Sequence, residues 1–270
     1  MKIKNGQKME MYMGHYKYKS DMISEEVFID YFKRINKILY DLKIKYWLSF
    51  GTLLGYIREG KHIIGDSDID FGTDTKGFDI LEQHKHLFYE QGFAITENKF
   101  RNRGKWRGLF IYDPKIKNFH IDISEWKLDE ETSRYTFRWH LRLNLPAKIF
   151  DFAYKIIAKI MIKFNDINNI QNTDFNRYKK PSILKIISNI CFEIDWFFNT
   201  KRQLEVYIPY VIPVEYYDVK TYIPAYPHTY TKTNYGKNFM IPDNKFCAKG
   251  GSECIKGKTK DGFERCYLDE

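Results

Sequence analysis

Cysteine is scarce in this sequence, with 4 residues in 270. A disulfide-stapled scaffold needs far more, so that class of small secreted protein is excluded. The first residues, Met1 to Gly6, lead into polar sequence and not into the apolar core of a signal peptide. We therefore expect reduced thiols and a cytoplasmic protein.

Long uninterrupted apolar runs are also missing. The longest hydrophobic region, 147–164, is interrupted by Lys148, Asp151 and three further lysines, which excludes a transmembrane span. Its apolar residues still recur at helical spacing opposite the lysines. Such a helix either caps a catalytic sheet, the alternative we favour, or lies peripherally on an anionic membrane.

What the chain does have is aromatic residues and positive charge. It contains 21 Phe, 21 Tyr and 5 Trp, and 43% of its residues are hydrophobic, which excludes wholesale disorder. Its 44 basic and 35 acidic residues leave a net charge of +9. This favours anionic, phosphorylated or polyanionic partners without choosing among them.

Periodicity and turn residues indicate a mixed α/β (α+β) chain with one catalytic domain. We predict an extension over residues 1–23, a catalytic domain over 24–243 with its core in 24–131 and a helical or irregular C-terminal cap in 145–243, and a Cys-, Lys- and Gly-rich tail over 244–270. Helices are expected at 24–43, 53–58, 78–91, 147–164 and 183–198, strands at 46–50, 66–72, 93–96, 108–112 and 119–124, and an irregular, proline-punctuated stretch at 209–242.

An Asp-x-Asp-x-Asp run at residues 66–70 is the strongest chemical signal. On a strand, Asp68 and Asp70 project from one face about 7 Å apart, while Ile69 and Phe71 point into the core. Carboxylates held this close repel each other, and a divalent cation is the usual reason to keep both ionised; hard oxygen ligands select Mg²⁺ or Mn²⁺. Asp122 on an adjacent strand would complete the site.

If it stood alone, this run would be better explained as a solvated acidic turn or loop. It follows a short strand that stops at Gly51-Thr52 and leads directly into a helix, however. A small turn at a helix N-terminus offers backbone N–H groups and a dipole to a phosphate. Strand, small turn, helix and acidic second strand form the pattern of the nucleotidyltransferase superfold.

These motifs resemble the LicD family of phosphotransferases, which includes fukutin and fukutin-related protein. The likeness rests on Gly-Thr-Leu-Leu-Gly-Tyr-Ile-Arg at 51–58, Asp-Ser-Asp-Ile-Asp at 66–70, and Asn-Tyr-Gly-Lys-Asn-Phe-Met at 234–240. It covers about 46–243. Two departures are Ile64-Gly65, where the family often has Pro-Trp, and the cysteine-bearing tail.

The resemblance implies transfer of a phosphorylated alcohol, such as phosphocholine, ribitol phosphate or glycerol phosphate. The alcohol phosphate would move from a CDP-alcohol donor to a glycan or lipid-linked glycan hydroxyl, releasing CMP. Asp68 and Asp70 match the family's metal pair and Asp122 looks like the third carboxylate, either as a ligand or as the base. Gly51, Thr52 and Arg58 are expected to bind the donor phosphates. Asp66 is expected either to contribute to substrate binding or to cap the strand.

Other features carry weaker signals. The basic run Arg101, Arg103, Lys105 and Arg107 could meet an anionic substrate, but a solvated hairpin face explains it better. Trp106 within it could equally well stack on a base or sugar or anchor the core. His120 is more typical of a packing residue than of a catalytic one. Cys247, Cys254 and Cys266 lack close-paired zinc spacing.

Two rival functions stay open. A nucleotidyltransferase would move a nucleoside monophosphate to a small acceptor and release pyrophosphate with the same carboxylates. A basic nucleic-acid-binding protein with a degenerate site would show steep salt dependence and no turnover. We rank it last and expect no nucleic-acid partner, because three carboxylates repel a phosphate backbone.

Overall fold

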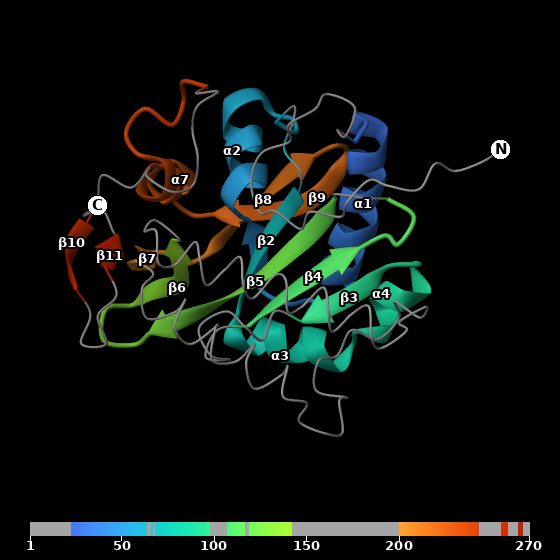
Figure 1. Ribbon diagram of the computed structural model, residues 1–270, viewed down its shortest axis with the longest axis horizontal. Helices are drawn as coiled ribbons and strands as arrows, with labels where there is room; N and C mark the ends of the chain where they lie inside the picture. Colours follow the sequence, from blue (N-terminus) through green and yellow to red (C-terminus); the bar gives the residue numbers. More distant parts are fainter. Residues whose placement is uncertain are drawn as a thin grey trace, which may run out of the picture.

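A computed structural model describes the chain over residues 23–63, 66, 68–97, 107–116, 119–141, 200–242, 255–258 and 264–266. Helices flank a mixed β-sheet (Figure 1). The helices are α1 (Glu25–Asp41), α2 (Phe50–Glu59), α3 (Thr75–Gln83), α4 (His86–Glu90) and α7 (Pro227–Tyr235). The strands are β1 (Tyr46–Leu48), β2 (Asp68–Asp74), β3 (Ala94–Glu97), β4 (Gly108–Tyr112), β5 (His120–Asp129), β6 (Arg134–Leu141), β7 (Thr200–Val206), β8 (Val211–Tyr216), β9 (Val219–Pro224), β10 (Ile255–Lys258) and β11 (Glu264–Cys266).

The sheet is built around the long strand β5. Its first half pairs in parallel with β2 and antiparallel with β4, and its second half pairs antiparallel with β6. Within the described residues the strand order is β1-β2-β5-β6-β7-β11-β10, with β3 attached to β4. Because β2 and β5 are parallel and adjacent, residues two apart on each strand form one continuous face.

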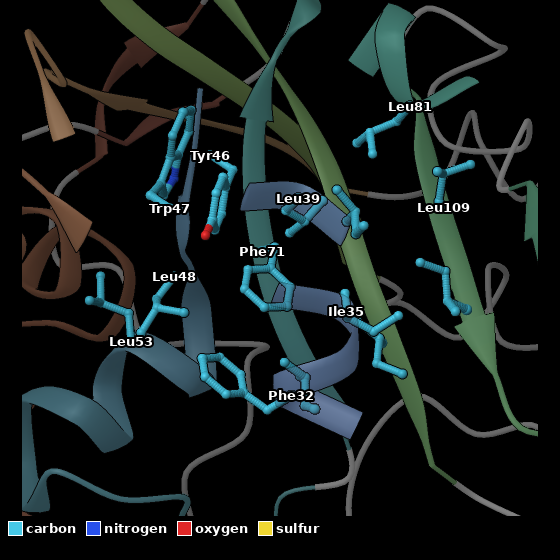
Figure 2. Packing of buried hydrophobic residues seen from close by; sticks show 14 of the residues in the cluster. Phe32, Ile35, Leu39, Tyr46, Trp47, Leu48, Leu53, Phe71, Leu81 and Leu109 are labelled. Atoms are coloured by element: carbon cyan, nitrogen blue, oxygen red, sulfur yellow. The ribbon is translucent and has the colours of Figure 1, made fainter. Parts of the chain in front are cut away.

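Helix α1 covers one face of this sheet and supplies much of the core. Ser24 caps it by accepting a hydrogen bond from the Val27 N–H at 3.3 Å, and the buried residues Phe32, Ile35 and Leu39 recur at helical spacing. The Phe32 ring stacks on Phe71 of β2 with centroids 5.8 Å apart. Figure 2 shows these side chains gathered against β1 and β2. The hydrophobic face of α1 thus meets the non-acidic face of β2.

Most predicted elements of the core are present, with shifted ends. The strand predicted at 119–124 extends to Asp129, since β6 pairs with its second half. The helix predicted at 78–91 is divided into α3 and α4: its chain turns at His84, whose Nδ1 lies 2.8 Å from the Ile80 carbonyl oxygen. Phe50, predicted as the end of a strand, is the first residue of α2.

The prediction of an irregular stretch at 209–242 is wrong. This segment contains the β8–β9 hairpin and helix α7. Pro213 is tolerated because both strands of a two-stranded sheet are edges, and Pro227 occupies the first turn of α7, where its missing N–H is no loss. The hairpin turns at Tyr217 and Asp218, both with positive φ (51° and 62°), without the glycine that usually signals such a turn.

The hairpin is fixed to the core by a buried polar connection. Asn36 of α1 donates its side-chain amide to the Lys220 carbonyl at 2.8 Å, and Tyr46 of β1 donates its hydroxyl to the Asn36 oxygen at 2.9 Å. β9 also contacts β1. The C-terminal half of the chain is therefore tied to its N-terminal half.

Several predictions fall outside the described residues. They are the helices at 147–164 and 183–198, the extension at 1–22, the basic run before Arg107, Trp106, and the tail positions Cys247 and Cys254. The predicted domain boundaries likewise stay predictions.

Candidate active site

The first component of the site is the turn between β1 and α2. β1 ends at Leu48, Ser49 is the N-cap of α2, and the Ser49 carbonyl accepts the first helical bond from Leu53 at 2.9 Å. Phe50 has a φ of 37°, in the left-handed region that bulky residues avoid. This sharp turn points the next N–H, that of Gly51, toward β2.

The second component is an acidic face on β2 and β5. Parallel pairing places Asp70 beside Asp122 and Asp68 beside His120. Asp70 and Asp122 are each only 7% exposed. The alternate residues Ile69 and Phe71 are fully buried in the opposite, apolar face. The sheet thus brings together the three carboxylates predicted from sequence on one face.

Backbone and hydroxyl contacts join the turn to the acidic face. The Gly51 N–H donates to Asp70 Oδ2 at 3.1 Å, and the Asp70 N–H donates to the Thr52 hydroxyl oxygen at 2.8 Å. A Cβ on Gly51 would lie 2.3 Å from Asp66 Oδ2, so any side chain there would require the Asp66 carboxylate to move. The structure therefore places Gly51, Thr52, Asp66 and Asp70 together, although the Gly51 N–H binds a carboxylate here.

Asp70 is the electrostatic centre of this group. Burial raises its pKa well above its ordinary value, and the negative charges of Asp68, Asp122 and Asp66 raise it further. The Gly51 N–H acts in the opposite direction by stabilising the carboxylate. Carboxylates crowded in this way attract a proton or a cation.

His120 and Phe110 border the acidic face. His120 Nε2 lies 3.6 Å from Asp68 Oδ2, and both side chains are 26% exposed. The His120 ring stacks on Phe110 of β4 at a centroid distance of 5.2 Å. His120 thus has an aromatic and an acidic neighbour and sits at the partly open edge of the site.

Arg58 is held by the C-terminal segment. Its Nε donates to the Phe239 carbonyl oxygen at 2.6 Å, and its Nη2 to the Ile241 carbonyl oxygen at 3.2 Å. Burial lowers the pKa of Arg58. These contacts make Arg58 a clamp between α2 and the segment after α7, and its predicted contact with phosphate stays a prediction.

Arg107, the described member of the basic run, belongs to a salt-bridge network. It donates to Glu125 Oε1 at 2.8 Å, to Glu82 Oε2 at 2.8 Å and to Asp79 Oδ1 at 2.6 Å. Glu125 is fully buried. Arg107 therefore connects β4 and β5 to α3, as a structural interpretation of its charge would expect.

Two tyrosines of α7 reach the site, and neither was assigned a role from sequence. The Tyr230 hydroxyl hydrogen-bonds the Ser49 hydroxyl in the β1–α2 turn. Burial raises the pKa of Tyr235, and the charges of Asp70, Asp66 and Asp68 raise it further. The only sequence signal was the Asn-Tyr-Gly motif at 234–236.

The metal prediction has mixed support from the geometry. In the described part of the chain, no group of three or more His, Cys, Asp or Glu side chains is arranged so that it could hold a metal ion. The donor chemistry nonetheless fits Mg²⁺ or Mn²⁺, since it consists of carboxylate oxygens whose mutual repulsion a cation would relieve. The metal stays a prediction.

Comparison with known proteins relates one segment of the chain to a protein family. Residues 43–157 match the family model described as "LicD/FKTN/FKRP, nucleotidyltransferase domain". The match spans less than half of the chain and confirms the resemblance predicted from the motifs at 51–58 and 66–70. Members of that family are generally transferases, which supports the expectation that this protein is an enzyme.

The match stops before the C-terminal motif, so the wider extent predicted for the family likeness is not covered by it. One solved structure, titled "Crystal Structure of ANT(2″)-Ia in complex with adenylyl-2″-tobramycin", is similar at 14% identity with a TM-score of 0.30. That alignment covers 39% of this chain and 53% of the other, so this chain spans about half of that protein. The search of curated proteins found no match.

None of the described helices is both long enough and apolar enough to cross a bilayer.

Proposed function

We propose that this protein transfers a phosphorylated alcohol from a CDP-alcohol to a glycan hydroxyl and releases CMP, with a divalent metal ion. The observation that carries the proposal is the register of β2 and β5, which sets Asp70 beside Asp122 against the Gly51 turn. The family match supports phosphotransfer in general. The alcohol and the glycan are specified by neither.

Asp68, Asp70 and Asp122 would hold the metal ion. A bound Mg²⁺ or Mn²⁺ neutralises negative charge on the diphosphate oxygens as the bond to CMP breaks. The chain's own residues supply the geometry: the sheet presents the carboxylates on one face, and Gly51, which has no side chain, lets Asp66 lie close to the turn.

The proposed reaction needs one general base, which takes the proton of the acceptor hydroxyl. The acceptor oxygen forms a bond to the phosphorus of the alcohol phosphate, the bond from that phosphorus to the CMP oxygen breaks, and the hydroxyl proton leaves to a carboxylate. Asp122 stands beside Asp70 and can take this role or serve as a ligand, and both assignments remain open. A carboxylate bound to metal has a depressed pKa and is a weaker base, so the two roles compete.

The test measures CMP released from CDP-choline, CDP-ribitol and CDP-glycerol with Mg²⁺ or Mn²⁺. Slow hydrolysis of the donor is scored, so that no acceptor has to be known. We expect CMP from one donor and loss of that signal with EDTA. Silence with all three donors, in protein shown to bind Mn²⁺, would count against the proposal.

The Asp70→Asn variant gives the residue-level prediction. It should lower CMP release at least about 10³-fold, because charge stabilisation at the reacting phosphate is the main source of rate in this chemistry. Asp218→Asn is the matched control, since Asp218 is 91% exposed in the β8–β9 turn and Asn accepts its positive φ. Activity retained in Asp70→Asn would contradict the assignment of this carboxylate.

The alternative function is transfer of a nucleoside monophosphate with release of pyrophosphate. The matching family domain is described as a nucleotidyltransferase domain, which favours keeping it. The same carboxylates would serve both reactions. Product analysis separates them, because CMP from a CDP-alcohol supports the first and pyrophosphate from a nucleoside triphosphate supports the second.

A further inference from the structure

The β1–α2 turn lacks the support that helix starts normally have. Ser49 occupies the N-cap position of α2, but its side chain makes no capping hydrogen bond to the helix. The following residue, Phe50, is held at a φ of 37°. Backbone in this region persists only when surrounding contacts impose it, and such strain concentrates at functional sites.

The missing support comes from α7, about 180 residues further along the chain. The Tyr230 hydroxyl hydrogen-bonds the hydroxyl of Ser49, the N-cap residue, although the two lie 181 residues apart in the sequence. Burial raises the pKa of the Tyr230 hydroxyl, and its contacts with Ser49 and the Phe50 backbone N–H act in the opposite direction. α7 packs along α2, which brings Tyr230 to the turn.

The Tyr230 side chain is itself immobilised. It is 2% exposed, and its ring lies 5.5 Å from the ring of Trp126. Trp126 also packs on Phe50 at 5.9 Å and on Phe137 at 5.1 Å. The turn and the tyrosine that bonds it are thus held in one aromatic cluster, formed by Phe50, Trp126, Phe137 and Tyr230.

The β1–α2 turn also positions the carboxylate of Asp70. The Ser49 N–H donates to the Asp70 carbonyl oxygen at 3.0 Å, and the Gly51 N–H donates to the Asp70 carboxylate at 3.1 Å. A change in the turn therefore moves the donors that hold Asp70. Displacements of about 1 Å at such sites can lower rates about 10²-fold.

We propose that Tyr230 is a positioning residue of the active site, whose hydroxyl acts through Ser49 to hold the strained Phe50–Gly51 turn against Asp70. Tyr230 touches no reacting atom. Its kinetic consequence rests on the proposed function, whereas its effect on the turn does not.

Tyr46→Phe is a closely matched control for Tyr230→Phe. Tyr46 is fully buried and donates its hydroxyl to one side chain, that of Asn36. Its ring packs at 6.0 Å on Phe71, which lies on the apolar face of β2 (Figure 2). Both substitutions remove a buried tyrosine hydroxyl that hydrogen-bonds another side chain, so both should lower Tm.

The deciding experiment is amide hydrogen exchange of the full-length protein, followed by mass spectrometry on peptides that contain residues 49–53. Tyr230→Phe and Ser49→Ala should each speed exchange there about tenfold, the effect of losing one hydrogen bond. The double variant should exchange no faster than either single variant, and Ser49→Thr should restore slow exchange. Tyr46→Phe should leave this segment unchanged. Equal exchange in Tyr230→Phe and Tyr46→Phe would overturn the inference.

Kinetics distinguish failure of this inference from failure of the proposed function. If the wild-type protein releases CMP, Tyr230→Phe should lower kcat about tenfold or more with little change in KM, since donor binding is kept while the carboxylate is misplaced. Unchanged kcat would overturn the inference. A wild-type protein that releases no CMP counts against the proposed function alone, and the exchange experiment still decides the role of Tyr230.

Discussion

Gly51 illustrates how one residue decides the shape of the site. Its N–H reaches the Asp70 carboxylate, and the position of a Cβ there is already taken by the Asp66 carboxylate. The sequence predicted Gly51 as a phosphate-binding residue of the turn. The tertiary structure adds a steric reason for glycine that no single-chain pattern contains.

Gly51→Ala tests this reason directly. The added methyl would have to displace Asp66 or the turn, so we expect CMP release to fall about 10²-fold. Thermal unfolding should change little, because the Asp66 side chain can rotate away. Gly108→Ala is the control: its nearest contact would be the Ile123 carbonyl oxygen at an ordinary 3.6 Å, and full activity is expected. Normal turnover in Gly51→Ala would show that the close approach has no functional role.

At the scale of elements, Arg107 and its acidic partners form a salt-bridge network between β4, β5 and α3. Arg107 binds the fully buried Glu125 through two side-chain nitrogens and its own backbone N–H, the latter at 3.1 Å. It also lies over the Phe78 ring at 4.8 Å. Arg107 belongs to a basic run that could have contacted substrate. In the structure it instead fixes α3 to the sheet.

Arg107→Met should lower the free energy of unfolding by about 3 kcal/mol, because it leaves the buried Glu125 without its charged partner. Replacing Glu125 with Met as well should recover part of the loss. Lys37→Met breaks only an exposed pair with Asp41 and should cost less than about 0.5 kcal/mol. Urea denaturation of the four proteins measures this, and an equal small effect for Arg107→Met and Lys37→Met would contradict it.

At the scale of the whole molecule, His62 couples stability to pH. Burial lowers the pKa of His62 from 6.5 to about 4, with Asp68 and Glu25 acting weakly in the opposite direction. The unfolded chain takes up this proton near pH 6.5, whereas the folded chain does so only near pH 4. Between these values the unfolded state binds more protons, so the contribution of His62 lowers stability as the pH falls.

His62→Phe should remove this acid sensitivity, since a phenyl ring can keep the stacking on Phe28 at 4.0 Å without titrating. We expect the stability difference between variant and wild type to shift in favour of the variant by up to about 3 kcal/mol from pH 7 to pH 4. The raised pKa of Asp70 acts oppositely in both proteins and cancels in the difference. Denaturant unfolding at several pH values measures it, and a pH-independent difference would refute it.

The sequence by itself determined the acidic strand, the glycine turn and α1, because these depend on local spacing: alternation on a strand and a 3.6-residue period on a helix. The sequence also indicated the resemblance to the LicD family, through the spacing of its motifs at 51–58 and 66–70. Its failures were the division of the helix at His84 and the β8–β9 hairpin. That hairpin turns on Tyr217 and Asp218, with no glycine to announce it.

Only the tertiary structure decided which residues share the site. The register of β5 against β2 set Asp122 beside Asp70, the docking of α7 on α2 brought Tyr230 to Ser49, and the segment after α7 bound Arg58. Each of these contacts joins residues more than 50 positions apart. Such contacts depend on how whole elements pack, and no local pattern of residue types encodes that packing.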